Sequence, residues 1–123
     1  MEQNLIRGKR ILLVDDELGL RGSFRLLLEI DDHIVTEADN GAEALDLFTK
    51  GQFDLVATDF EMPVMKGNEL AVRIKKLAPK QPILMVTAYG KELGESQNPV
   101  DSILNKPFTL DSLRKAIAKL LSN

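Results

Sequence analysis

The sequence has no cysteine, no tryptophan and a single histidine, His33, among its 123 residues. The absence of cysteine excludes a disulfide framework and a thiolate metal site, and it is compatible with a reducing cytoplasm. One histidine leaves little room for a histidine-based metal cage or a phosphohistidine relay. The longest apolar run, Ile11 to Val14, is far too short to span a bilayer, and the first residues lack the parts of a signal peptide. We therefore expect a cytoplasmic protein without a membrane partner.

The net charge and the composition further limit the classes of protein to which the chain can belong. A net charge of −3, from 16 basic and 19 acidic side chains, makes the chain a poor candidate for binding nucleic acid through its overall field. Hydrophobic residues make up 44% and charged residues 28%, which is typical of globular proteins and excludes a disordered tail, a collagen-like fibre and a coiled coil. No repeat or linker divides the chain, so a single domain is expected over residues 1–123.

Short apolar runs alternate with segments of helical periodicity. The runs predict strands over residues 10–14, 34–37, 54–58, 83–86 and, more weakly, 100–104. Residues 11–14, 55–57 and 83–86 within these runs are apolar throughout, as expected for strands covered on both faces of a parallel sheet. Apolar residues at helical spacing predict three buried helix stripes: Leu20, Phe24, Leu27 and Leu28; Leu70, Ile74 and Leu77; Leu113, Ile117, Leu120 and Leu121.

Two further segments complete the alternation. The stretch from Gly41 to Lys50 predicts a shorter helix that begins after Asn40. Between Tyr89 and Val100, glycines and a proline surround one apolar residue, so the fourth helix is predicted to be short or degenerate. The pattern as a whole predicts an α/β fold of the doubly wound (βα)5 type with a five-stranded parallel sheet.

Polar side chains follow the predicted strands where each strand ends. Asp15 and Asp16 follow the first strand, Asp59 the third, Thr87 the fourth and Lys106 the fifth. The carboxyl ends of parallel strands meet at one edge of the sheet, where ligands bind at the point of reversed strand order. With strand order 2-1-3-4-5, the three aspartates would converge across that reversal, and Thr87 and Lys106 would close the site from the other side.

This set of side chains matches metal-assisted phosphoryl transfer onto an aspartate. Three carboxylates in one cleft repel one another unless a cation lies between them, and oxygen ligands without histidine or cysteine select a hard cation such as Mg2+. A lysine supplies a point charge and a threonine a hydroxyl for phosphoryl oxygens. A carboxylate can act as the nucleophile and form an acyl phosphate, with charge stabilisation as the main catalytic contribution.

Four stretches resemble the response-regulator receiver domain of two-component signalling, of the chemotaxis-receiver type. They are Arg10-Ile-Leu-Leu-Val-Asp-Asp-Glu17, Asp54-Leu-Val-Ala-Thr-Asp-Phe-Glu-Met-Pro63 with Gly67, Val86-Thr-Ala88 and Lys106-Pro-Phe108. Each stretch alone is a weak signal, but all four in this order, each at a predicted strand end, are specific. The resemblance extends over a core from about residue 9 to residue 121 and implies a single receiver domain with a flavodoxin-like fold.

The resemblance implies a phosphorelay switch with a magnesium site. Asp59 accepts a phosphoryl group from a sensor histidine kinase or a phosphotransfer protein, and the switch then changes the binding of a downstream protein. The implied Mg2+ ligands, which would also accept Mn2+, are Asp15, Asp16, Asp59 and the backbone carbonyl of Glu61. Such a phosphoprotein is not an enzyme with an external substrate, because it catalyses only its own phosphotransfer and autodephosphorylation.

The resemblance also assigns the residues that respond to the phosphoryl group. Lys106 pairs with it, Thr87 hydrogen-bonds it and reports its arrival, and the Lys106–Pro107 bond is cis. Most receivers carry Phe or Tyr three residues before the lysine, as part of the switch, whereas this chain has Ile103. With a degenerate fourth helix as well, the usual output surface is expected to be remodelled. The identity of the downstream partner and the formation of a homodimer stay open.

Two other functions compete with the phosphorylated switch. A receiver fold can act as an unphosphorylated docking or dimerisation module, which the remodelled fourth-helix region favours. A haloacid-dehalogenase-type phosphatase also uses an aspartyl phosphate, but it requires a second aspartate two residues after the nucleophile, where this chain has Glu61. Neither a P-loop nor a dinucleotide fingerprint occurs in the sequence.

Tyr89 and Glu61 are predicted to modulate the lifetime of the acyl phosphate. They lie two residues after Thr87 and Asp59, respectively, where the family controls the access of water. We expect Tyr89→Ala to change the dephosphorylation rate severalfold, because the ring would no longer shield the acyl phosphate. The measurement is the decay of the phosphorylated protein, and an unchanged lifetime would remove Tyr89 from the mechanism.

Overall fold

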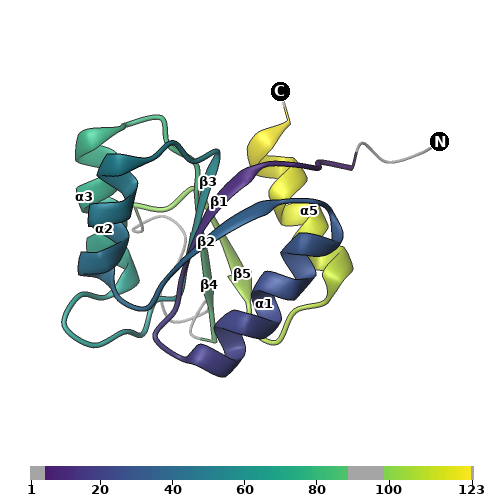
Figure 1. Cartoon of the computed structure of the whole chain (residues 1–123), viewed down its shortest axis with the longest axis horizontal. Coiled ribbons are helices and arrows are strands. Elements are labelled where there is room, and N and C mark those ends of the chain that lie inside the picture. The colour runs from purple at the N-terminus through teal and green to yellow at the C-terminus, as the bar shows by residue number, and fades with distance from the viewer. Residues whose placement is uncertain (1–4, 89–98, 123) are drawn as a thin grey trace.

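The computed structural model describes residues 5–88 and 99–122 and contains one parallel five-stranded sheet. The strand order is β2-β1-β3-β4-β5, which confirms the predicted topology (Figure 1). The strands are β1 (Arg10–Val14), β2 (Ile34–Ala38), β3 (Leu55–Thr58), β4 (Ile83–Thr87) and β5 (Ser102–Asn105). The helices in the described ranges are α1 (Leu18–Ile30), α2 (Gly41–Lys50), α3 (Gly67–Leu77) and α5 (Leu110–Leu121). None of these helices is long and apolar enough to cross a membrane.

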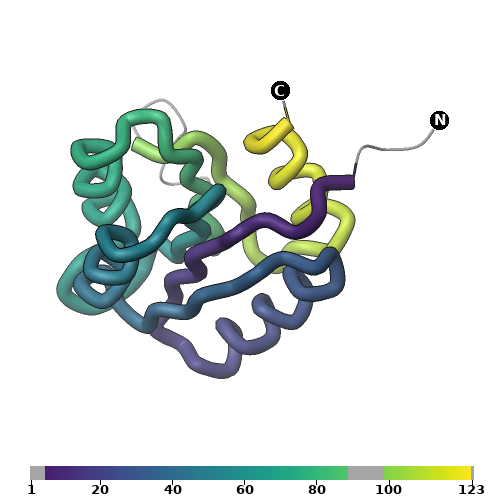
Figure 2. Tube along the Cα trace, turned by 45° about the horizontal axis from the view of Figure 1, so that its top comes forward, coloured from purple at the N-terminus to yellow at the C-terminus, as the bar shows by residue number. Residues whose placement is uncertain are grey.

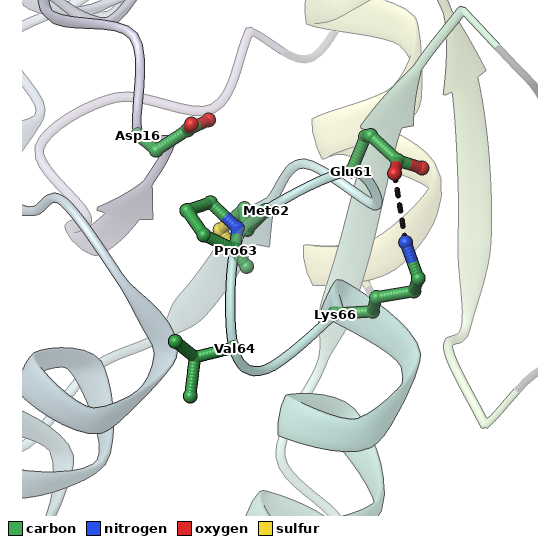
Figure 3. Close-up of a pocket in the computed structure, with 6 residues that line it drawn as sticks. All are labelled: Asp16, Glu61, Met62, Pro63, Val64 and Lys66. Atoms are coloured by element: carbon green, nitrogen blue, oxygen red, sulfur yellow. Dashed lines mark hydrogen bonds and ion pairs between the residues drawn. The ribbon is translucent and has the colours of Figure 1, made fainter.

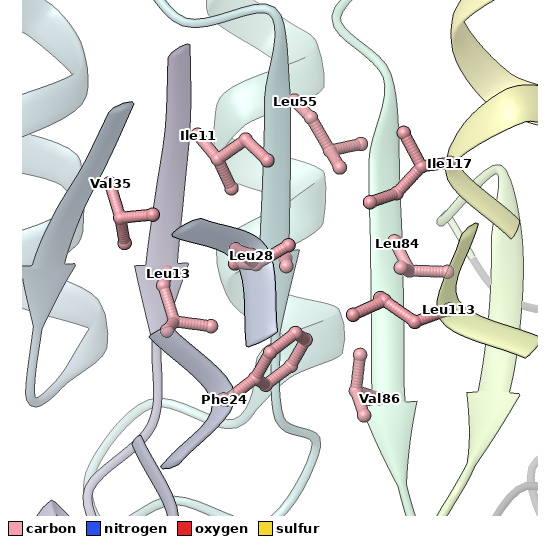
Figure 4. Packing of buried hydrophobic residues seen from close by; sticks show 11 residues of the cluster. Ile11, Leu13, Phe24, Leu28, Val35, Leu55, Leu84, Val86, Leu113 and Ile117 are labelled. Atoms are coloured by element: carbon pink, nitrogen blue, oxygen red, sulfur yellow. The ribbon is translucent and has the colours of Figure 1, made fainter. Parts of the chain in front are cut away.

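The sheet is covered on both faces, with α1 and α5 on one side and α2 and α3 on the other (Figure 1). Side chains alternate along β1, so Ile11 and Leu13 join the cluster under α1 and α5, while Leu12 and Val14 join the cluster under α2 and α3. Figure 4 shows the first cluster, in which Phe24 and Leu28 of α1 close over the sheet. Burial of each such aliphatic side chain contributes roughly 1.5–3 kcal/mol to the free energy of folding. The two helix layers therefore stabilise the sheet and fix the positions of its strand ends.

The observed strands differ from the predicted ones mainly at their ends. β3 begins at Leu55, and the side chain of the preceding residue, Asp54, accepts a hydrogen bond from the backbone N–H of Arg10. β5 begins at Ser102, later than predicted, and the carboxylate of the preceding residue, Asp101, accepts hydrogen bonds from the N–H of Ile83 and from Lys75. The predicted degenerate fourth helix falls largely on residues 89–98, which lie outside the described residues, as does Tyr89.

The predicted stripe of α1 was wrong at one position. Phe24 and Leu28 are buried, but Leu20 is 53% exposed and Arg21, its neighbour in the sequence, is 9% exposed. The helix is therefore rotated so that a charged side chain faces inward in place of a leucine. Leu77, at the end of the predicted α3 stripe, is also exposed, because the helix ends there beyond the edge of the core.

The turn between α1 and β2 is tied to α5. Asp31 is buried and accepts two hydrogen bonds from the Arg114 guanidinium, at 2.9 and 2.8 Å, which hold the pKa of that carboxyl below its usual range. His33 is also buried, with Nδ1 accepting a hydrogen bond from the N–H of Lys9 at 3.0 Å, and burial lowers the pKa of its imidazole. These contacts hold the start of the chain beside α5 in both views (Figure 2).

A glycine lets the loop between β3 and α3 close on itself. A Cβ atom at Gly67 would lie 2.1 Å from the backbone oxygen of Asp59 and 3.0 Å from the Cα of Phe60. The N–H of Gly67 also donates to the backbone oxygen of Phe60 at 2.9 Å. Backbone therefore packs on backbone at this point, and no other residue type fits without moving the segment that follows β3.

We expect Gly67→Ala to lower the free energy of unfolding by about 1–3 kcal/mol, because the added methyl group overlaps backbone that cannot yield without moving the loop. The matched control is Gly22→Ala, within α1, where nothing lies within 4 Å of the added Cβ. Gly22→Ala should raise the free energy of unfolding by about 0.5–1 kcal/mol, because alanine favours a helix interior. Urea unfolding measures both, and equal effects of the two substitutions would contradict the close contact at Gly67.

Candidate functional site

Three aspartates converge at the carboxyl edge of the sheet. One carboxylate oxygen from each of Asp15, Asp16 and Asp59 lies within 4.8 Å of the others. Asp15 and Asp59 directly follow β1 and β3, which are hydrogen-bonded neighbours with Val14 opposite Thr58. The structure thus brings together the three acidic residues that the sequence placed at the strand ends. Asp15 is buried, the Asp59 side chain is 14% exposed and Asp16 is exposed, so the cluster opens to solvent on one side.

Backbone hydrogen bonds hold the first and third aspartates in fixed orientations. The N–H of Asp15 donates to the carbonyl of Ala38 at 3.1 Å, and the N–H of Asp59 donates to the carbonyl of Val14 at 3.0 Å. The Oδ1 atom of Asp15 accepts the N–H of Glu17 at 3.0 Å, and the Oδ1 atom of Asp59 accepts the N–H of Phe60 at 2.9 Å. With one oxygen of each carboxylate occupied in this way, the Oδ2 atoms face the interior of the site.

Lys106 closes the site from the side of β5. Its Nζ atom lies 3.4 Å from the Oδ2 atom of Asp15 and 3.6 Å from that of Asp59. The N–H of Lys106 donates to the carbonyl of Thr87 at 2.9 Å, which joins the ends of β4 and β5. Thr87 is fully buried as the last residue of β4, and the Lys106–Pro107 peptide bond is cis, as the resemblance implied. All five predicted side chains therefore lie at one edge of the sheet.

The charges of the site favour a bound cation. Burial raises the pKa of Asp59, Lys106 acts in the opposite direction, and the neighbouring Asp15 and Asp16 carboxylates raise the pKa again. One lysine does not balance three carboxylates, so a divalent cation would relieve the remaining repulsion. The available donors are carboxylate oxygens, which fit a hard cation such as Mg2+ and do not favour a soft metal.

Glu61 lies at the open side of the acidic cluster and has a partner that the sequence did not reveal. A pocket of about 450 Å3 opens here, and its lining includes Asp16, Glu61 and Lys66 (Figure 3). The Nζ atom of Lys66 lies 2.7 Å from a carboxylate oxygen of Glu61 and 5.3 Å from the centre of the Phe60 ring. Lys66 therefore holds the predicted modulating carboxylate in an ion pair. Only the loop geometry reveals this pair, because its members lie five positions apart in the sequence without a regular period.

A largely apolar groove adjoins the polar site, and Asp15 and Lys106 are part of its lining. It has a volume of about 440 Å3 and is lined by Leu20, Phe24 and Leu27 of α1 together with Pro107 and Phe108. The sequence analysis assigned Leu20 and Leu27 to a buried stripe and did not find this groove. Its floor is the ring pair of Phe24 and Phe108, whose centroids lie 5.0 Å apart. The groove places an apolar surface directly beside the polar site.

The predicted switch position lies on β5. Ile103 is half-buried and pairs with Met85 of β4 in the parallel register. An aliphatic side chain thus fills the position at which the resemblance implies an aromatic ring. Tyr89, the other residue predicted to act near the site, lies outside the described residues.

We expect Asp59→Asn to raise the melting temperature by about 2–5 °C in buffer without divalent cations, because the substitution removes one of three mutually repelling carboxylates. The control is Asp46→Asn, which changes the net charge equally at an exposed position of α2, where Asp46 pairs with Lys50. That variant should melt within about 1 °C of the unmodified chain. Differential scanning calorimetry measures both, and a lower melting temperature for Asp59→Asn would contradict repulsion within the cluster.

Comparisons with known proteins agree with this geometry. The transcriptional regulatory protein GlrR of Escherichia coli is 36% identical over 110 residues, which cover 87% of this chain and 25% of GlrR. Sporulation initiation phosphotransferase F of Bacillus subtilis is 32% identical over 117 residues, which cover 93% of this chain and 94% of that protein. The chain thus spans about a quarter of the first relative and nearly all of the second.

Solved structures share the fold at similar identity. The response regulator protein TrrA of Thermotoga maritima, in complex with Mg2+-BeF, matches with a TM-score of 0.85 at 38% identity over 92% of this chain and 99% of TrrA. TrrA in complex with the histidine kinase ThkA matches with a TM-score of 0.84 at 38% identity over 93% of this chain and 99% of TrrA.

The family of the response regulator receiver domain accounts for most of the chain. Its family model matches residues 11–118. That range includes β1 without its first residue, β2 to β5, the three aspartates, Thr87 and Lys106. The chain is therefore a member of the response regulator receiver domain family of two-component signalling.

Proposed function

We propose that the chain is a phosphoacceptor switch, which takes a phosphoryl group onto Asp59 in a Mg2+-dependent reaction and then changes partner binding. The observation that carries this proposal is the convergence of three carboxylates and Lys106 between the ends of β1, β3 and β5. The chain catalyses only its own phosphotransfer and autodephosphorylation and has no external substrate to turn over. Its expected location is the cytoplasm, without direct contacts to nucleic acid or membrane.

The geometry suggests which oxygen of Asp59 reacts. Oδ1 already accepts the N–H of Phe60, whereas Oδ2 faces Lys106 at 3.6 Å. In the proposed step Oδ2 attacks phosphorus, a P–O bond forms, and the bond from phosphorus to the donor nitrogen or oxygen breaks, with the electron pair leaving on the donor. Lys106 then pairs with one phosphoryl oxygen and the Thr87 hydroxyl donates to another. The main catalytic contribution is then charge stabilisation of the phosphoryl oxygens.

The metal that this reaction needs would lie among the acidic residues. Asp15, Asp16, Asp59 and the backbone carbonyl of Glu61 would hold Mg2+, which neutralises the charge that accumulates on the phosphoryl oxygens. Mn2+ also favours oxygen ligands and is expected to substitute. The complex of TrrA with Mg2+-BeF supports this assignment, because TrrA is 38% identical to this chain over 92% of its length.

A histidine kinase or a phosphotransfer protein is the proposed donor. Support comes from the complex of TrrA with the histidine kinase ThkA and from the similarity to sporulation initiation phosphotransferase F. The groove formed by Leu20, Leu27 and Phe108 supports it too, because it offers the donor an apolar contact beside Lys106. Leu18 and Leu26 of α1 are also largely exposed but do not line this groove.

The test is intact-mass analysis after incubation with acetyl phosphate, a phosphodonor that needs no protein partner. We expect a phosphoryl adduct on the unmodified chain in Mg2+, none after chelation of the metal, and none on Asp59→Asn. The matched control, Asp46→Asn, should carry the adduct like the unmodified chain, because Asp46 lies on α2 and pairs with Lys50.

Absence of the adduct under every condition would reject the phosphorylated switch and favour the second candidate, a docking or dimerisation module that acts without phosphorylation. The observations that favour this module are Ile103 at the usual position of an aromatic switch and the exposed leucines of α1. The unphosphorylated chain would then bind its partner, or a second copy of itself, without the need for a phosphoryl group.

A further inference from the structure

Arg21 of α1 is a buried cation that the proposed reaction does not use. Within residues 5–88 and 99–122 it is the one buried side chain among the lysines and arginines. Its burial comes with the exposure of Leu20, so the rotation of α1 loses apolar burial and removes a guanidinium from water. Both changes are unfavourable by themselves, and specific contacts of Arg21 must therefore offset them.

The guanidinium connects β2 with the segment that follows β1. Its Nη1 donates to the backbone carbonyl of Asp15 at 2.6 Å, and its Nε donates to the carboxylate of Glu37 at 2.7 Å. The other oxygen of Glu37 accepts a hydrogen bond from Arg25 at 2.7 Å. The carbonyl that accepts from Nη1 belongs to the peptide group that joins Asp15 to Asp16. Because that group is planar, a fixed carbonyl direction also fixes the start of the Asp16 backbone.

Asp15 is therefore held at every polar group it has. Its N–H donates to Ala38 at 3.1 Å, its Oδ1 accepts from Glu17 at 3.0 Å, its Oδ2 lies 3.4 Å from Lys106, and its carbonyl accepts from Arg21. The contact with Arg21 reaches the backbone carbonyl of Asp15 and not its carboxylate. A lysine could not replace it fully, because one ammonium group lacks the rigid fork that reaches two acceptors.

We propose that Arg21 is a positioning residue for the metal site: it sets the direction of the Asp15–Asp16 peptide and thereby presents both carboxylates to the cation. This inference rests on the proposed function, because it assigns to Arg21 a role in the Mg2+ affinity of that site. Removal of a hydrogen bond that orients a metal-binding residue typically changes the metal affinity about 10–100-fold. Glu37 in turn accepts the hydrogen bond from the Nε atom of Arg21.

The test compares Mg2+ binding by the unmodified chain with binding by Arg21→Met and Arg25→Met. Arg25 is the matched control, because it pairs with the same Glu37 but makes no contact with Asp15. Amide chemical shifts at residues 15–17 and 59–61 report the dissociation constant, at a temperature where circular dichroism shows each variant folded. We expect Arg21→Met to raise the dissociation constant about tenfold or more and Arg25→Met to leave it within about twofold.

A second variant covers the case in which Arg21→Met does not fold. Arg21→Lys retains the charge and most of the volume, and it should weaken Mg2+ binding severalfold because one of the two contacts is lost. An unchanged dissociation constant for either folded Arg21 variant overturns the inference while leaving the proposed function intact. Failure of the unmodified chain to bind Mg2+ is a different result, because it overturns the proposed metal site and the role of Arg21 together.

Discussion

The pairing of β1 with β3 at the centre of the sheet is the constraint on which the site depends. β1 is hydrogen-bonded to β2 on one side and to β3 on the other, and both of its faces are buried. A shift of one residue would exchange the side chains that face the two helix layers, which is energetically prohibitive in a buried strand. The register therefore also fixes the distance between the residues that follow the two strands, Asp15 and Asp59.

The same constraint concentrates negative charge at one edge. Hydrophobic burial along β1 and β3 stabilises the sheet, while the carboxylates at the strand ends repel one another. Lys106 reduces this repulsion at the Asp15 carboxylate, and Arg21 contacts the Asp15 backbone carbonyl. The apolar residues within β1 and β3 thus stabilise the fold, whereas the carboxylates that directly follow these strands destabilise it. The free energy gained in the core offsets the repulsion between the carboxylates. A cation that entered the cluster would meet carboxylates of Asp15 and Asp59 whose orientations are already fixed by backbone N–H groups.

Sequence reasoning succeeded where the signal is local or follows from topology. The apolar runs identified the strands, and the polar residues at their ends identified the edge at which Asp59 and Lys106 meet. It was wrong about the face that α1 buries, because helical periodicity treats Leu20 as a better core residue than Arg21. The two contacts that favour burial of Arg21 come from β2 and from the turn after β1, which no pattern within α1 contains.

The sequence by itself determined the alternation of strands and helices, the buried faces of the central strands and the chemical types available at the carboxyl edge. Each of these depends on side chains that are close along the chain or repeat with a fixed period. The tertiary structure alone decided the rotation of α1, the ion pair of Glu61 with Lys66 and the groove beside Phe108. These features depend on how separate elements pack against one another. That packing is set by the free energy of the whole fold and cannot be predicted from any one segment.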